Sequence, residues 1–362
     1  MASYRYLTCD AVSGSVLVWD LPLTDVSYGP ELNGPGTLQA TLEPHMAHVL
    51  GAMVDPGNTL IFAERDERLM WGGLIWRAEP EGGRYPIEAA GFGSYLNKRH
   101  DVHGNLNGRG PYTYGDPCKL IRDVWAYCQS QPDGNLGVTV DATTSRATIG
   151  TPQEPYATTW WEAPALADIV TDAVSVFGGP EWTEQVAWAS GLPERRIQIG
   201  WPRLGARRTD VSFTTGVNIA DLQPVTYDGD AYAQVVVALG AGQGQARQRA
   251  TDAVRDGRLR LEEVLDLPTI KGTDQLAAKA RQGRVARQIR GSIEQVHIID
   301  HPAARFGSFG IGDDVWVQIH DQWTDYDGWA RVTGWTLTPA QGTQQERMAV
   351  SLAPADSFIY GG

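Results

Sequence analysis

The sequence predicts a mainly β protein with α+β segments inserted between two β-rich regions. Short runs that alternate apolar and polar residues recur near both ends of the chain, as half-buried strands require. Gly (41) and Trp (13) are abundant while Phe (7) is scarce, which suits short strands joined by tight turns. The length of 362 residues exceeds a single core of about 100–150 residues, so we expect two or more domains.

Residues 1–100 contain strand signals at short spacing. The candidates are Tyr4–Thr8, Val16–Trp19, Thr37–Leu42, Leu60–Glu64, Leu69–Trp71, Leu74–Arg77 and Tyr85–Ala89. The charged tip Arg65–Arg68 and the turn Glu81–Gly83 each indicate a hairpin. This spacing predicts a small antiparallel barrel or sandwich.

Residues 101–210 predict an α+β domain. Asp116 is a helix N-cap signal followed by Pro117, and apolar residues recur at helical spacing as far as Cys128. A second helix begins near Leu166 and stops at Gly178–Gly179.

The second β region comprises residues 211–244 and 291–362. Its signals are the apolar run Ala231–Leu239 and the alternations at Val315–Ile319 and Met348–Leu352. Residues 245–290 interrupt it with eleven basic and six acidic residues, a charge of about +5 against about −18 for the rest of the chain. Two helix candidates bracket a strand at Leu259–Leu261, so we expect an inserted subdomain.

Composition narrows the classes of function. The net charge of −13 disfavours broad nucleic-acid binding. Three cysteines (Cys9, Cys118 and Cys128) form no disulfide framework and lie in no zinc-like spacing with histidine, which favours a reducing compartment for assembly. The first residues lack a signal-peptide pattern, and no apolar run approaches about 18 residues, so we expect no membrane span.

The motifs that could carry chemistry are weak. Val235–Gly244 runs from a strand into a Gly-rich loop, but its spacing is GxGxG without βαβ alternation, which favours a turn over a dinucleotide site. The close histidine pairs (His45 with His48, His100 with His103, and His297 with His301) lack the third ligand that zinc needs. The sequence has no nucleophile elbow and no phosphate-binding loop. Its adjacent carboxylates Asp313 and Asp314 would face opposite ways on a strand. We expect no enzymatic activity, no catalytic residue, no cofactor and no bound metal.

A basic stripe is the one candidate docking feature. It consists of Lys279, Arg281, Arg284, Arg287 and Arg290, of which the middle three recur every three residues and could share a helical face. The stripe could dock an acidic partner or a neighbouring subunit, or could simply be a solvated face. Nucleic acid is the weaker alternative, because no aromatic residues interleave with these bases.

Trp side chains offer a second candidate for binding. We expect Trp76 and Trp335 in the core, because they occupy alternating strand positions. Trp323 and Trp329 could be core residues or exposed rings that bind a sugar or a protein.

Several segments resemble minor tail proteins of long-tailed phages that infect actinobacteria, a family similar to the baseplate-hub and tail-associated proteins of other tailed phages. The resemblance is carried by Leu7–Asp10, Val16–Leu17, Leu21–Leu23, Leu32–Gly36, Ala63–Asp66, Met70–Trp76, Gly91–Leu96 with Arg99, Asn218–Gly242 and Gly312–Val317. It spans most of the chain, although each motif is short and apolar.

The resemblance implies a baseplate-hub-like architecture with two tube-type antiparallel β-barrels and peripheral α/β subdomains. The implied domains are a first barrel in 1–100, a peripheral α+β domain in 101–210, a discontinuous second barrel in 211–244 and 291–362, and the basic insertion in 245–290. It also implies a structural role at the tail tip of the virion, with assembly in the cytoplasm of the bacterial host.

In that role, three copies would form a ring that joins the tail tube to tip proteins and lines the path of the DNA. The implied partners are further copies of the chain, a distal tail or tail-tube protein and other tail-tip proteins. Genomic DNA would pass without specific binding, which an acidic lumen favours. The alternatives are a tail-tip hydrolase that degrades peptidoglycan and a carbohydrate-binding tail module.

Overall fold

The structure is a computed structural model of the 362-residue chain. It describes residues 2–42, 54–221, 229–230, 232–268, 270, 272–287, 293–322 and 325–355.

Most of the regular structure is strand. The strands are β1 (Tyr4–Asp10), β2 (Val16–Val18), β3 (Leu23–Glu31), β4 (Gly34–Leu42), β5 (Thr59–Arg65), β6 (Arg68–Ala78), β7 (Tyr85–Gly91), β8 (Val138–Val140), β9 (Glu181–Ala189), β10 (Leu192–Gly200), β11 (Arg207–Thr214), β12 (Ile219–Asp221), β13 (Val235–Leu239), β14 (Arg249–Ala253), β15 (Glu262–Asp266), β16 (Gln295–Ile298), β17 (Asp314–His320), β18 (Asp325–Thr338) and β19 (Arg347–Pro354). The α-helices are α2 (Asn105–Gly108), α3 (Pro117–Gln129), α4 (Leu166–Ser175) and α5 (Thr273–Arg287). The 3-10 helices are η2 (Phe92–Lys98), η3 (Trp160–Glu162) and η4 (Gly244–Ala246).

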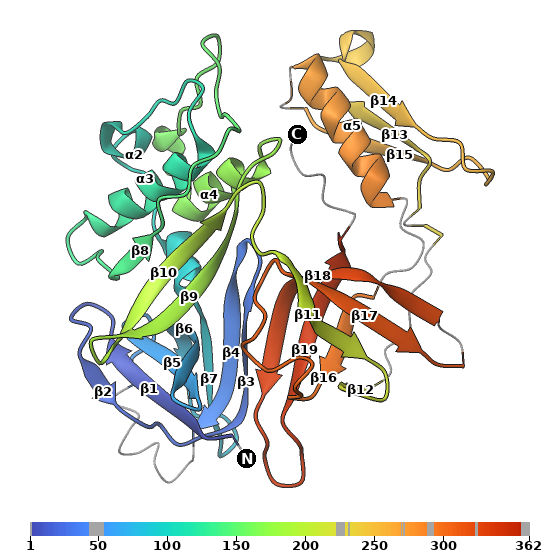
Figure 1. The fold of residues 1–362 in the computed structure, drawn as a ribbon. Helices are drawn as coiled ribbons and strands as arrows, with labels where there is room; N and C mark the ends of the chain where they lie inside the picture. The colour runs from blue at the N-terminus through green and yellow to red at the C-terminus, as the bar shows by residue number, and fades with distance from the viewer. Residues whose placement is uncertain are drawn as a thin grey trace.

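One 13-stranded sheet joins the two β-rich regions (Figure 1). Its order is β12-β16-β19-β18-β3-β4-β7-β6-β5-β1-β2, and β17 pairs with both β18 and β11. Nearly all neighbours are antiparallel, β11 with β17 being the parallel exception.

The two regions meet where β3 pairs with β18. Tyr28 lies opposite Leu337, and the rings of Tyr28 and Trp335 meet edge to face at 6.2 Å. At Gly29 the two backbones are so close that a Cβ would stand 1.6 Å from the Trp335 carbonyl oxygen. This pairing can therefore form only with glycine at position 29.

Side-chain alternation lets the first β region serve two cores. Tyr6 and Ile61 point into a core shared with the second β region, where they meet residues such as Val315. Their neighbours Leu7 and Phe62 point to the opposite face and pack with α3, α4 and the β9–β10 hairpin. The α+β segment thus covers one face of the first region, and the second β region contacts the other.

A small α/β unit stands apart from both cores, at the upper right of Figure 1. Its sheet has the order β14-β13-β15, and α5 packs on one face through Leu276 and Ala280 against Ala238.

The fold class predicted from the sequence, mainly β with α+β insertions, is confirmed. The two amphipathic helices are present as α3 and α4. The candidates at Leu69–Trp71 and Leu74–Arg77 are parts of one strand, β6.

Other local expectations are corrected. Leu259–Leu261 is not a strand, because the pairing with β13 starts at Glu262. Only the second of the two bracketing helices is present, as α5, and η4 with β14 replaces the first. Val235–Leu239 pairs with β14 and β15 rather than with the large sheet. The assignment of four domains stays a prediction.

Gly29→Ala should lower the free energy of unfolding by about 3 kcal/mol or more, because the new methyl group overlaps backbone that cannot rotate away. Urea unfolding measures the loss. The control is Gly34→Ala on β4, where a Cβ meets only the flexible Glu31 side chain at 3.4 Å and the change should stay within about 0.5 kcal/mol. Equal losses in the two variants would contradict the steric account of this strand pairing.

Candidate functional site

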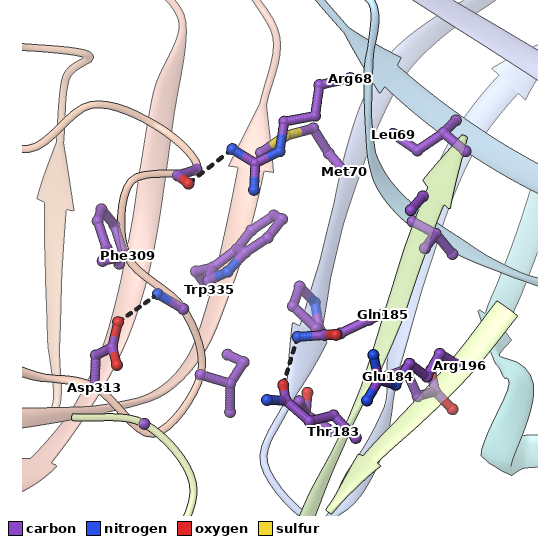
Figure 2. A pocket seen from close by; sticks show the side chains of 18 of the residues that line it. Arg68, Leu69, Met70, Thr183, Glu184, Gln185, Arg196, Phe309, Asp313 and Trp335 are labelled. Carbon is purple, nitrogen blue, oxygen red and sulfur yellow. Dashed lines mark hydrogen bonds between the residues drawn. The ribbon is translucent and has the colours of Figure 1, made fainter. Parts of the chain in front are cut away.

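A cleft of about 460 Å³ opens where the first β region, the β9–β10 hairpin and the second β region meet. Figure 2 shows Phe309 and Trp335 on one wall, Gln185 and Arg196 on the opposite wall, and Arg68 and Met70 between them. Arg68 spans the gap by donating a hydrogen bond to the Gly307 carbonyl at 2.8 Å. The cleft is therefore a junction between three parts of the chain.

A buried ion pair holds this junction together. Arg331 on β18 is fully buried, and its guanidinium makes two contacts with the Glu181 carboxylate on β9, one of them at 2.7 Å. The same guanidinium donates to the Gly312 and Leu204 carbonyls at 3.2 and 3.1 Å. With its charge balanced and its donors used, Arg331 fixes the β9–β10 hairpin to the second β region.

The carboxylate doublet has a structural role. Asp313 accepts the Ala206 and Gly310 N–H groups, both at 2.9 Å. Asp314 pairs with Arg203 at 2.9 Å and with Arg207 at 3.8 Å. The two carboxylates therefore bind different partners, and Asp313 lies just before β17 rather than on the strand with Asp314.

Glu184 lines the cleft and has a strongly raised pKa. Its Oε1 accepts the Gly93 N–H, while its Oε2 is buried without a partner and lies where a Cβ on Gly91 would be. Burial raises the pKa of Glu184 to about 8, although the N–H groups of Gly93 and Phe92 oppose the shift. The carboxyl faces the backbone at the start of η2, so it is placed to lock the hairpin onto β7 rather than to reach a molecule in the cleft.

The cysteines are poor nucleophiles. Burial raises the pKa of Cys9 and Cys128 to about 11 and that of Cys118 to about 12, so the reactive thiolate is disfavoured at neutral pH. Within the described ranges, no cluster of three His, Cys, Asp or Glu side chains could hold a metal ion. No helix among these residues is long and apolar enough to span a membrane.

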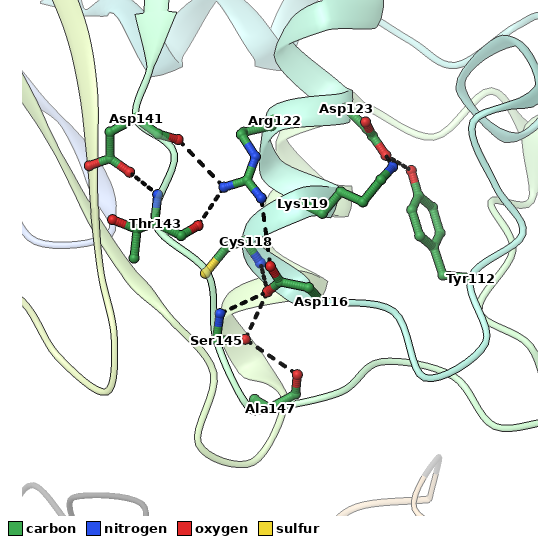
Figure 3. Close-up of polar contacts among 10 residues, drawn as sticks. All are labelled: Tyr112, Asp116, Cys118, Lys119, Arg122, Asp123, Asp141, Thr143, Ser145 and Ala147. Atoms are coloured by element: carbon green, nitrogen blue, oxygen red, sulfur yellow. Dashed lines mark hydrogen bonds and ion pairs between the residues drawn. The ribbon is translucent and has the colours of Figure 1, made fainter.

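Cys118 also belongs to a polar cluster at the start of α3, shown in Figure 3. Asp116 caps the helix by accepting the Cys118 N–H at 2.9 Å, and it accepts the Ser145 hydroxyl at 2.8 Å. Arg122 pairs with Asp116 at 3.6 Å and donates to the Thr143 carbonyl at 2.5 Å. These contacts fasten the loop 141–147 to the helix, and they confirm the predicted N-cap.

The basic stripe is partly internal. Arg284 pairs with Asp252 at 2.6 Å and Arg287 pairs with Glu263 at 3.1 Å, because both acids flank Val236 on the helix-facing side of the small sheet. Lys279 donates to the Ser175 carbonyl at the end of α4 at 3.2 Å. Arg281 is exposed, and Arg290 lies outside the described residues. The structure therefore does not bring the five together as one open face.

The Gly-rich motif is a turn, as predicted. β13 leads through residues 240–243 and the short 3-10 helix η4 into the antiparallel strand β14, so no α-helix follows the glycines. His100 and His103 bind different partners, the Ala163 carbonyl and the Tyr127 hydroxyl, both at 2.8 Å. His45 and His48 lie outside the described residues.

The Trp expectations have mixed outcomes. Trp335 is buried as expected, and Trp76 is partly buried with its Nε1 donating to the Ser94 hydroxyl at 2.8 Å. Trp329 is half-buried against Trp316, with the Arg207 guanidinium 4.6 Å from its ring centre. Trp323 lies outside the described residues. Among the Trp residues that the structure describes, the most exposed are Trp19, Trp160 and Trp161, which the strand pattern did not single out as exposed.

Glu181→Gln should lower the free energy of unfolding by about 3 kcal/mol or more, because it leaves the Arg331 charge buried without a counter-ion. The exposed pair Arg77–Glu79 provides the control, and Glu79→Gln should cause a much smaller loss. Urea unfolding of both variants tests the difference. Similar small losses would show that the buried pair does not hold the junction.

Glu184 should make stability fall as pH rises. Between the ordinary glutamate pKa of 4.5 and about 8, the native state keeps a proton that the unfolded chain has released. The contribution of Glu184 is therefore fully present at low pH and is lost through this interval. Glu184→Gln should flatten the dependence, as measured by urea unfolding between about pH 5 and about pH 9. Glu194→Gln, an exposed residue on β10, controls for the lost charge, and an unchanged slope in Glu184→Gln would refute the assignment.

No protein-family model matches the sequence, and no curated protein matches it. Three solved structures are similar in fold over almost the whole chain. The 43 kDa tail protein of prophage MuSo2 from Shewanella oneidensis has a TM-score of 0.63 at 10% identity, covering 98% of both chains. The tail protein from Neisseria meningitidis MC58 has a TM-score of 0.58 at 11% identity, covering 97% of this chain and 96% of that one. Prophage tail protein gp18 from Listeria monocytogenes EGD-e has a TM-score of 0.54 at 10% identity, covering 96% and 94%. The chain therefore has a fold similar, end to end, to those of three tail proteins.

Proposed function

We propose that the chain is a structural protein of a phage-type tail. The observation that carries the proposal is the coverage of the fold similarity, at least 94% of each of three tail proteins, which includes the peripheral segment and the small α/β unit as well as the β regions. A similarity restricted to one β region would have pointed only to a common building block. The buried thiols and the structural use of the Asp313–Asp314 doublet are consistent with a role in assembly rather than catalysis.

More specifically, we propose a hub or minor tail protein at the tail tip. Each chain carries two β regions in one continuous sheet, so three copies in a ring would present six β regions around an axis. Such a ring fits a role in joining a sixfold tail tube to tip proteins. The net charge of −13 would let genomic DNA pass without adhering.

The assignments of four domains and of partner docking belong to this proposal. The rigid attachment of the β9–β10 hairpin through Glu181 and Arg331 supports a peripheral domain that moves with the ring. The exposed Arg281 on α5 is the stripe residue best placed to meet an acidic neighbour.

Light scattering coupled to size exclusion should show a species with three times the chain mass of 39.5 kDa. Negative-stain images of the same peak should show rings with a central hole, because heterologous contacts that close make rings. An open filament or a persistent monomer would contradict the ring. A monomer that clears a peptidoglycan suspension would favour the hydrolase alternative instead.

A further inference from the structure

The α+β segment contains five successive residues with positive φ, of which the central three carry a Cβ and are therefore strained. φ is positive at Gly104 (81°), Asn105 (46°), Leu106 (55°), Asn107 (58°) and Gly108 (78°). The element α2, at the upper left of Figure 1, is therefore a left-handed turn, closed by the Gly108 N–H on the Gly104 carbonyl at 3.0 Å. This conformation is disfavoured for every residue with a Cβ, and strain of this kind gathers at binding sites.

A buried carboxylate maintains the turn. Asp101 is fully buried, and its Oδ2 accepts the Leu106 N–H at 2.9 Å and the Thr158 hydroxyl. Asn105 and Thr158 exchange two further hydrogen bonds of 3.1 and 3.0 Å. These contacts over-determine the strained backbone and join it to the segment that follows Thr158.

That segment presents two indoles to solvent. Trp160 and Trp161 in η3 are 45% and 68% exposed, and their rings stand nearly perpendicular, at 77°, with centres 6.1 Å apart. A Cβ at Gly104 would lie 3.7 Å from the Trp160 indole, so the left-handed turn packs against one side of this ring. Ala163, itself at φ 49°, closes the segment by donating to the Trp160 carbonyl at 3.0 Å.

We propose that the α2 turn and the Trp160–Trp161 pair form a glycan-binding site, which we call the indole site. An exposed indole offers a π face on which the C–H face of a pyranose ring can pack. Because the two rings are nearly perpendicular, the site suits an oligosaccharide of at least two sugar units. Exposed polar side chains near the pair supply donors and acceptors for sugar hydroxyls. Glu162 follows Trp161 in sequence, and His103 precedes Gly104, which lies against the Trp160 indole.

The geometry favours a glycan over a protein partner. A stable protein interface buries about 800 Å² on each partner around an apolar centre. Here the two indoles stand beside exposed polar residues, and the strained turn holds one of them in place before any partner binds. Preorganised aromatic platforms with polar neighbours suit a small, polar ligand. The inference is independent of the ring, because the site lies within one chain.

The test is binding of the purified chain to an array of bacterial-envelope polysaccharides, followed by calorimetry with the best soluble oligosaccharide. Trp161→Ala should weaken binding about 10-fold or more, the loss typical of truncating a central aromatic residue. Trp161→Phe should retain part of the affinity, because a smaller ring can still stack. Both variants should keep the melting curve of the parent, since the side chain is exposed.

Trp19→Ala is the matched control. Trp19 is 53% exposed on the first β region, so its loss removes an exposed indole away from the site and should leave glycan binding unchanged. Asn107→Gly and Asn107→Val test the turn. Glycine adopts positive φ readily whereas a β-branched residue resists it, so only the valine variant should lose affinity.

Three results would overturn the proposal. The parent chain could bind no glycan on the array, or Trp19→Ala could weaken binding as much as Trp161→Ala. In the third, glycans do not bind while Trp161→Ala prevents co-purification of tail proteins, which would make the pair a protein interface. Selective loss in Trp161→Ala with rescue by Trp161→Phe would establish the indole site.

Discussion

The close backbone contact between β3 and β18 is the constraint on which the architecture depends. Where Gly29 meets the Trp335 carbonyl there is no space for a side chain, so the two β regions become one sheet. Once they are joined, their inner faces seal a single core that runs from Tyr6 to Leu352. The opposite face of the first region is then left for the helices α3 and α4. Glycine at position 29 is therefore a condition for this arrangement of the layers.

Buried ion pairs fix how the two β regions and the β9–β10 hairpin are oriented relative to one another. Hydrophobic contact is non-directional, whereas the hydrogen bonds between a guanidinium and a carboxylate are directional. Arg331 ties the second β region to Glu181, and Arg65 ties the first to Glu346 and Asp300, both at 2.8 Å. The cleft lies where the parts of the chain joined by these ion pairs meet. Some of its polar residues hold its walls, as Arg68 does at the Gly307 carbonyl and Asp313 at the Gly310 N–H.

Strained backbone lies elsewhere, in the α+β segment that covers the outer face of the first β region. The left-handed turn at α2 is held by the buried Asp101 carboxylate, which accepts the Leu106 N–H. The turn lies against the Trp160 indole, which is exposed on its other side. A rigid framework and an exposed, preorganised tip are compatible because they use different parts of the chain. Under the function proposed above, this separation would keep the surfaces used in assembly apart from the indole site.

The sequence by itself determined the elements whose signals are local. The cap at Asp116 and the apolar periodicity of α3 predict that helix because both depend on residues within a few turns. The strand β3 was not predicted, because Gly29 and Pro30 interrupt its alternation. The need for glycine at position 29 arises only from its contact with Trp335, which is distant in the sequence. The basic stripe shows the same limit. Its spacing indicated one helical face, but Asp252 and Glu263, which neutralise Arg284 and Arg287, come from strands that only the tertiary fold brings under the helix. The exposure of Trp160 and Trp161 was likewise decided by the tertiary structure, since burial depends on what packs above a ring and not on the residues beside it.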